Sequence, residues 1–230
     1  MRGNSPNVQS AQNAPHRRLH ETLERHRQHA WRQPIADHSR LAFERLCAWT
    51  SARASMPLVL DSGCGIGAST LKLAGMHPDC AVLGIDQSRA RLAQHLGPSA
   101  DMAQIAPHAA VLRAPLQDIW RLLLADGIRL HRHLLWYPNP WPKPEHLGRR
   151  WHAHPVFPTL LALGGEIELR CNWRVYVDEF ALALSTYGWS SALDVVHESD
   201  PPATPFERKY RDSGHVLWRL TAVAPIPEGG

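Results

Sequence analysis

Residues 58–67 read LVLDSGCGIG, and this stretch decides the fold class of the chain. The short apolar run from Leu58 to Leu60 predicts a buried strand, and the glycines after it predict a tight turn into a helix. Glycine lets a ligand lie against the backbone of such a turn, and the N-terminus of the helix faces that ligand. The stretch therefore predicts a ligand-binding α/β domain.

The alternation of strand and helix signals continues downstream, which is typical of a parallel sheet covered by helices. We predict seven strands, at residues 58–60, 81–85, 109–112, 131–136, 166–170, 193–196 and 216–222. The predicted helices lie at 66–76, 88–96, 116–125 and 155–163, with Ser88 as an N-cap. A longer helix follows Trp173, because Trp173, Tyr176, Val177, Phe180 and Leu184 recur at helical spacing.

The chain has three predicted parts. Residues 1–15 are polar and are expected to be a disordered tail. Residues 16–55 are expected to form an N-terminal helical segment, and residues 56–224 the single globular domain. The part from Arg17 to Arg32 holds five arginines, which suit either a solvated helix or an arm that contacts RNA.

Composition narrows the class of protein. The formal net charge of +4 gives weak support for a polyanionic partner. The four cysteines lie far apart without C-x-x-C spacing, so we predict neither a disulfide framework nor a zinc site, and a reducing cytoplasm fits best. The histidines between His146 and His154 have no spacing that suits a metal, and no metal is predicted. No apolar run approaches the roughly 20 residues that a membrane span needs. The sequence does not indicate how many copies of the chain associate.

Two ligand classes fit the glycine-rich turn. Gly63, Gly65 and Ala68 satisfy the G-x-G-x-x-A fingerprint of dinucleotide-binding dehydrogenases, and Asp86 lies near the expected position of the ribose-binding acid. Asp61 favours the other class, because a carboxylate there repels a pyrophosphate but attracts the ammonium group of S-adenosylmethionine. The turn therefore favours a methyltransferase over a dehydrogenase, and Asp86 would bind ribose hydroxyls in either case.

A second candidate site is the proline loop, residues 137–143, which reads YPNPWPK after an apolar strand. Proline fixes its own φ and restricts the residue before it, so Asn139 and Trp141 are predicted to be extended. Such a loop is pre-organised to hold a small planar group.

Three segments resemble motifs of the tRNA (guanine-N7)-methyltransferase family in order and spacing: the proline loop, residues 171–173 (CNW) and residues 204–208 (TPFER). The family motifs are Pro-Asp-Pro-Trp-Pro-Lys, Thr-Asp-Trp and Thr-Lys-Phe-Glu. Asn139 and Asn172 replace two aspartates here, and Pro205 replaces a lysine, while Glu207 is retained. With the glycine-rich turn, the resemblance spans about residues 56–222.

The resemblance implies a class I methyltransferase with a Rossmann-like three-layer α/β/α sandwich, a mostly parallel seven-stranded sheet, S-adenosylmethionine as cofactor and tRNA as partner. It implies that Asp61, Gly63, Gly65, Asp86 and Asn139 bind the cofactor, that Asn139 lies at the reacting methyl group as the catalytic residue, and that Lys143, Asn172, Thr204, Phe206 and Glu207 bind the substrate. Where the family has an acid after its third strand, this chain has Pro115; Asp118 could replace that acid or simply start a helix.

The chemistry of guanine indicates which step the replacement of the two aspartates would affect. N7 carries an in-plane lone pair and no proton, so its attack on a sulfonium methyl needs alignment and exclusion of water but no general base. Carboxylates would instead recognise the guanine N1–H and N2–H donors, and asparagine oxygens accept more weakly. A divergent paralogue that methylates another RNA base or a small planar molecule is thus one alternative, and an RNA-binding module without transfer activity is another.

The basic residues beside the proline loop complete the sequence-based site. Lys143, Arg149 and Arg150 could each neutralise an RNA phosphate, or they could form a solvated turn. Trp141 could stack on a base or pack beneath the loop.

Overall fold

A computed structural model of the chain describes residues 3–225, and these residues group into two units. The glycine-turn unit consists of Gln33–Trp136 and Ala162–Gly165. The proline-loop unit consists of the described residues up to Arg32, Tyr137–Leu161, and the described residues from Glu166 onward.

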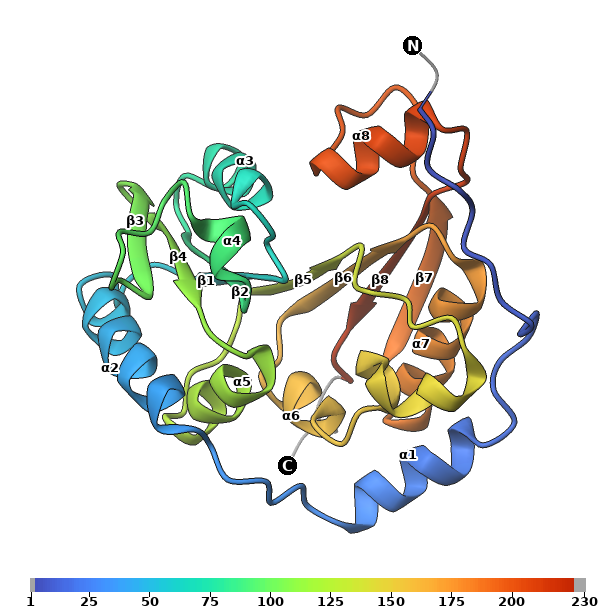
Figure 1. Cartoon of the computed structure of the whole chain (residues 1–230). Coiled ribbons are helices and arrows are strands. Elements are labelled where there is room, and N and C mark those ends of the chain that lie inside the picture. Colours follow the sequence, from blue (N-terminus) through green and yellow to red (C-terminus); the bar gives the residue numbers. More distant parts are fainter. Residues whose placement is uncertain (1–2, 226–230) are drawn as a thin grey trace. The chain divides into compact units, whose positions relative to one another are not determined.

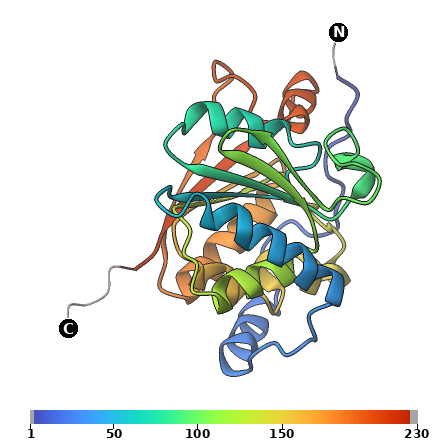
Figure 2. The ribbon, with the colours of Figure 1, turned by 90° about the vertical axis from the view of Figure 1, so that its left-hand side faces the viewer.

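The glycine-turn unit is a sheet with helices on both faces. Its strands run in the order β3-β4-β2-β1-β5, and all neighbouring pairs are parallel except β3 with β4. Helices α3 and α4 cover one face, and α2 and α5 pack together on the other (Figures 1 and 2). The elements are β1 (Leu58–Ser62), β2 (Ala81–Asp86), β3 (Met102–Ala106), β4 (Ala109–Arg113), β5 (Arg132–Trp136), α2 (Asp37–Ser51), α3 (Ala68–Met76), α4 (Arg89–Leu92) and α5 (Leu116–Ala125).

Continuous apolar runs explain the central strands of this unit. Every residue of β1 and β2 is buried, as expected for strands covered by helices on both faces. Ser88 caps α4 as predicted, since its side chain accepts a hydrogen bond from the Arg91 amide, although that helix is shorter than predicted. The edge strand β3 is not among the seven predicted strands, so the described residues contain eight strands.

The proline-loop unit is built around an antiparallel sheet with the strand order β6-β8-β7. Helix α7 packs on these strands, and α1 lies along α7 (Figure 1). The predicted apolar stripe of α7 is confirmed, because Tyr176, Val177, Phe180 and Leu184 are all buried. The elements are β6 (Glu166–Cys171), β7 (Ser190–Val195), β8 (Trp218–Val223), α1 (Leu19–Gln28), α6 (Phe157–Ala162), α7 (Arg174–Thr186), α8 (Pro205–Asp212) and the 3-10 helices η1 (Pro144–Arg149) and η2 (Trp151–Ala153).

The N-terminal residues of this unit run as an extended segment along it. Residues 3–15 carry no helix or strand, and their disorder stays a prediction. In the structure, Gly3 donates its amide hydrogen to the carbonyl of Asp212 in α8, and Ser10 Oγ donates to the carbonyl of Pro142. The basic helix α1 that follows buries Leu19 and Leu23. Its glutamates pair with Arg18, which precedes the helix, and with Arg27 within it.

Candidate active site

The glycine-rich turn leaves open space at two of its glycines. Gly63 and Gly65 have φ values of 85° and 60°, and a Cβ atom added to either would meet nothing within 4 Å. Gly67 differs, because a Cβ there would lie 2.9 Å from Nε2 of His95. Left-handed backbone favours glycine at all three positions, and the first two leave room for a ligand against the chain.

Asp61 lies buried at the end of β1, beneath this turn. Its Oδ2 accepts hydrogen bonds from Ser69 Oγ at 2.6 Å and from Thr70 Oγ1 at 2.7 Å, both in the first turn of α3. Burial raises the pKa of the Asp61 carboxyl to about 6, against the effect of the two hydroxyl donors. A cation beside this carboxyl would favour its ionised form.

Asp86, at the end of β2, braces the turn. Its Oδ2 accepts a hydrogen bond from the Gly65 amide at 3.0 Å, and its Oδ1 accepts one from the Ser88 amide at 2.8 Å. Arg91 forms an ion pair with the same carboxylate at 3.3 Å. The structure therefore brings Asp61, Gly63, Gly65 and Asp86 together at the carboxyl ends of parallel strands, where ligands of α/β sheets bind.

Asp118 has a structural role. It lies in the first turn of α5, and its Oδ2 accepts a hydrogen bond from Ser39 Oγ at 2.7 Å. The carboxylate therefore ties the start of α2 to the start of α5, which favours the helix-start interpretation over an adenine contact.

The proline loop differs from its predicted conformation. Tyr137 and Trp141 each precede a proline, and their φ values of 55° and 45° lie in the left-handed region, so the prediction that Trp141 is extended is wrong. Asn139 is exposed, and its Oδ1 accepts a hydrogen bond from the Trp141 amide at 3.3 Å. Left-handed conformations of bulky residues cost free energy, on the order of 1–3 kcal/mol each, so surrounding contacts must hold this loop.

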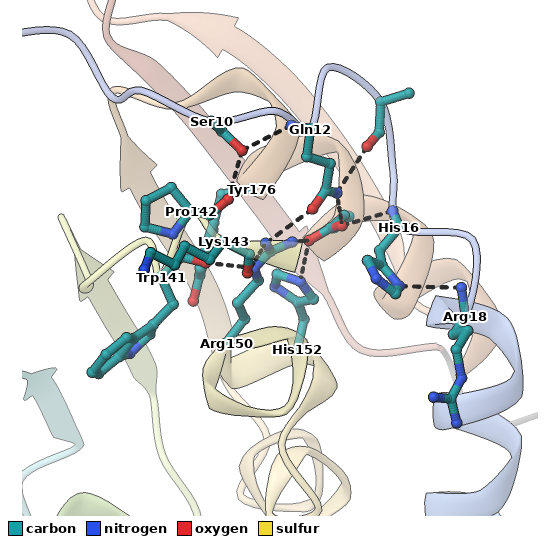
Figure 3. A network of polar contacts seen from close by, with 12 residues as sticks. Ser10, Gln12, His16, Arg18, Trp141, Pro142, Lys143, Arg150, His152 and Tyr176 are labelled. Atoms are coloured by element: carbon teal, nitrogen blue, oxygen red, sulfur yellow. Dashed lines mark hydrogen bonds and ion pairs between the residues drawn. The ribbon is translucent and has the colours of Figure 1, made fainter. Parts of the chain in front are cut away.

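Arg150 supplies such contacts, and its predicted role as a phosphate ligand is wrong. The side chain is completely buried, and its Nη1 lies 2.6 Å from Oε2 of Glu179, which is also buried. Figure 3 shows Arg150 beside Trp141 and Lys143 of the loop. Nε donates to the Trp141 carbonyl at 3.2 Å, and Nη2 donates to Lys143 O at 3.4 Å. Arg150 therefore holds the proline loop from inside.

Glu179 is the centre of this network, and Figure 3 labels its partners Gln12, His16, Arg150 and His152. It also accepts hydrogen bonds from His152 Nε2 at 2.9 Å, from Gln12 Nε2 at 2.6 Å and from the His16 amide at 2.8 Å. Burial opposes its ionisation, but the hydrogen bond from His152 and the charge of Arg150 outweigh burial and lower the Glu179 pKa to about 2. The carboxylate thus connects α7, the loop and the N-terminal segment.

Lys143 and Arg149 remain available at the surface. Both are exposed, and the Arg149 guanidinium lies 4.7 Å from the ring centroid of Trp141. Trp141 is partly buried and also contacts His146 edge-on. Phosphate contacts by Lys143 and Arg149 stay a prediction, whereas Arg150 is excluded from that role by its burial. No group of three potential metal ligands occurs within residues 3–225.

Glu207 lies at the centre of a second buried network. Its carboxylate accepts from Tyr137 Oη at 3.0 Å, from Arg170 Nη1 at 3.0 Å and from Arg211 Nη2 at 3.2 Å. Thr204 caps α8, since its Oγ1 accepts from the Glu207 amide at 2.9 Å. With no exposed surface, Glu207 is placed to hold the loop through Tyr137, and direct contact between Glu207 or Thr204 and the substrate stays a prediction.

Asn172 and Phe206 are the accessible members of the predicted substrate set. Asn172 is partly exposed at the carboxyl end of β6, and its Nδ2 lies 3.0 Å from Nδ1 of His215. Phe206 is 45% exposed and stacks on Tyr210 at 6.3 Å between ring centroids. An exposed ring beside a second aromatic residue suits stacking on a base.

Several residues of these networks were not predicted from the sequence: Glu179, Arg170, Tyr210 and His215. Glu179 carried a signal, because it falls within the apolar stripe of α7, where a charged residue needs a buried partner. The others carry no local signal.

Comparison with known proteins identifies the family. Residues 55–220 match a family model described as "Putative methyltransferase". The tRNA (guanine-N(7)-)-methyltransferase of a Nocardioides species is 31% identical over 72% of this chain and 67% of its own length. That of Pseudomonas aeruginosa is 28% identical over 71% of this chain and 69% of its own length. This chain belongs to the tRNA (guanine-N7)-methyltransferase family. It is a divergent member, only 31% and 28% identical to these two relatives.

Solved structures confirm the fold class of this divergent methyltransferase. A mutant 16S rRNA (adenine(1408)-N(1))-methyltransferase of Catenulisporales acidiphilia, crystallised with its cosubstrate SAM, aligns with a TM-score of 0.56 and 19% identity over 80% of this chain and 92% of its own. The 16S rRNA methyltransferase KamB aligns with a TM-score of 0.52 and 19% identity over 84% and 96%. The Rossmann-like class I fold is therefore confirmed. No helix within residues 3–225 is long and apolar enough to cross a membrane.

Proposed function

We propose that this protein transfers a methyl group from S-adenosylmethionine to N7 of a guanosine in tRNA. One observation carries the proposal: a single methyltransferase family match, over residues 55–220, includes the glycine-rich turn, the proline loop and the segment from Thr204 to Glu207. The relatives named tRNA (guanine-N(7)-)-methyltransferase support the choice of substrate. A tRNA substrate also suits action in the cytoplasm.

The residues of the glycine-rich turn fit S-adenosylmethionine. Gly63 and Gly65 leave their Cβ positions open, and the buried carboxyl of Asp61 suits an ammonium group better than a pyrophosphate. Asp86 keeps acceptor capacity for ribose hydroxyls beyond its bonds to backbone amides. When bound, this cofactor supplies an electrophilic methyl group on a sulfonium sulfur.

The chain's own task in this reaction is alignment. Guanine N7 needs no deprotonation, so no residue has to act as a base. Arg150 and Glu207 hold the proline loop in its left-handed conformation, and we assign Asn139 on that loop to the reacting groups. Lys143 and Arg149 are proposed to contact phosphates, and Phe206 and Asn172 to contact the base.

Incubation of the purified protein with methyl-labelled cofactor and either total RNA or a metabolite extract tests this function. We expect label in the tRNA fraction alone. Label in the metabolite extract would instead favour a small planar substrate, and binding of RNA with no label in either fraction would favour a module without transfer activity.

A further inference from the structure

Hydrogen bonds connect three groups in series: the Ser5 carbonyl, the His215 imidazole and the Asn172 amide. His215, which follows α8, places its Nδ1 3.0 Å from Asn172 Nδ2 and its Nε2 2.9 Å from the carbonyl oxygen of Ser5. Among the described residues, no further hydrogen bond engages the Asn172 side chain. All three residues belong to the proline-loop unit.

With Asn172 Nδ2 facing Nδ1 of His215 and the Ser5 carbonyl oxygen facing Nε2, a neutral imidazole ring leaves one direction for each hydrogen bond. A carbonyl oxygen only accepts, so Nε2 of His215 carries the hydrogen that faces Ser5. A neutral imidazole then has a bare lone pair on Nδ1, which accepts a hydrogen bond. The amide NH2 group of Asn172 is the donor that satisfies it, and the amide oxygen must therefore point away from His215.

Packing holds the imidazole in this position. The His215 ring stacks on Tyr210 with 5.2 Å between centroids and 15° between planes. Tyr210 in turn contacts Tyr137 of the proline loop at 5.5 Å. The Ser5 segment is fixed as well, because the Ser5 amide donates to Ser213 Oγ at 3.1 Å.

We propose that His215 is a positioning residue that turns the Asn172 amide so that its oxygen accepts a hydrogen bond from an N–H group of guanine. This inference rests on the proposed function and explains how asparagine replaces the family aspartate. A carboxylate presents an acceptor in either orientation, whereas an amide presents one only when its orientation is set. The N-terminal segment takes part, because the Ser5 carbonyl selects the tautomer.

Imidazole nitrogen NMR of the full-length protein tests the orientation directly. The His215 signals are identified by their loss in His215→Phe. We expect the ring hydrogen on Nε2 and a bare lone pair on Nδ1. A proton on Nδ1 would overturn the proposed direction of the Asn172 amide, whatever the protein methylates.

Steady-state kinetics with tRNA tests the role in recognition. His215→Phe keeps a ring to stack on Tyr210 but removes the acceptor, and we expect KM for tRNA to rise roughly three- to tenfold with kcat nearly unchanged. His215→Asn can place an amide oxygen near the Nδ1 position and should restore most of the loss. An unchanged KM in a folded His215→Phe protein would overturn the proposal.

A double variant separates positioning from simple packing. In Asn172→Asp both oxygens accept, so adding His215→Phe should change KM less than twofold. If His215→Phe raises KM equally in both backgrounds, His215 only supports the fold and the inference fails. A wild-type protein that transfers no methyl group to tRNA would overturn the proposed function, and the NMR result would still decide the orientation of Asn172.

Discussion

Arg150 Nη1 lies 2.6 Å from Glu179 Oε2, and neither side chain has exposed surface. The same guanidinium donates to the carbonyl of Trp141, a residue whose backbone is left-handed before a proline. A buried ion pair of the proline-loop unit therefore stabilises the conformation of the loop that carries Asn139.

Removal of Arg150 should be far more damaging than removal of its neighbour. Arg150→Ala leaves the buried Glu179 carboxylate without its cation, and we expect the free energy of unfolding to fall by about 3–5 kcal/mol. Arg149→Ala is the matched control, since Arg149 is exposed, and its stability should change by less than about 0.5 kcal/mol. Denaturant unfolding of both variants measures the difference. Equal stability of the two would contradict the assigned role of Arg150.

Glu179 should also make stability depend on acidity. Its pKa is lowered to about 2 in the folded protein, against roughly 4.3 in an unfolded chain. The folded state therefore gains stability from this group above about pH 4.3 and loses it as the pH falls toward 2. In Glu179→Gln this part of the pH dependence should disappear, so that the stability curves of variant and wild type converge in acid. Parallel curves between pH 5 and 2.5 would show that Glu179 titrates normally.

How far the sequence predicts the structure depends on the range of the interactions. The central strands β1 and β2 are predicted because each begins with a run of apolar residues and is buried along its whole length, whereas the edge strand β3 is only partly buried and has no such pattern. The same limit applies to the site. Gly63 and Gly65 act through their own backbone, so their role is visible in the sequence.

Arg150 shows why the rest of the site could not be predicted. In the sequence it is one of two adjacent arginines next to a loop, and nothing local separates it from Arg149. Its partners lie 29 residues away at Glu179 and 138 residues away at Gln12. Only the tertiary fold decides which of the two cations is buried.

Cofactor affinity should depend on the ionisation of Asp61. Because burial raises its pKa to about 6, the carboxyl is partly protonated near neutral pH and must lose that proton to pair with an ammonium group. Affinity for S-adenosylmethionine should therefore fall by about tenfold from pH 7 to pH 5. Calorimetry across this range, with Asp61→Asn as the control that lacks the titration, measures the effect. A pH-independent affinity in the wild type would place the ammonium group elsewhere.

Gly65 should tolerate no large side chain if the cofactor lies against the turn. Gly65→Arg should abolish binding of S-adenosylmethionine, because the new side chain occupies the open space above the backbone. Gly127→Arg is a matched control: Gly127 has a φ of 75° and equally open surroundings, so the backbone strain is alike. Calorimetry should find binding retained in the control. Loss of binding in both variants would trace the effect to instability instead.

Asn139 provides a test of substrate chemistry by the sign of an effect. Asn139→Asp keeps the oxygen that accepts from the Trp141 amide, so the loop should persist. If guanine is the substrate, the carboxylate strengthens hydrogen bonds to its N–H groups, and methylation should be kept or raised up to about fivefold, an effect of about 1 kcal/mol. A fall in turnover of tenfold or more, with the cofactor still bound, would indicate a substrate that presents an acceptor instead.

The identity of the methylated nucleoside tests the proposed reaction most directly. Unmodified tRNA is incubated with the protein and methyl-labelled S-adenosylmethionine, digested to nucleosides and separated by mass spectrometry, with Gly65→Arg as the inactive control. A tRNA (guanine-N7)-methyltransferase should place label in 7-methylguanosine alone, and the variant should place none. Label in any other nucleoside, or none from a wild-type protein that binds both cofactor and tRNA, would contradict the proposed reaction.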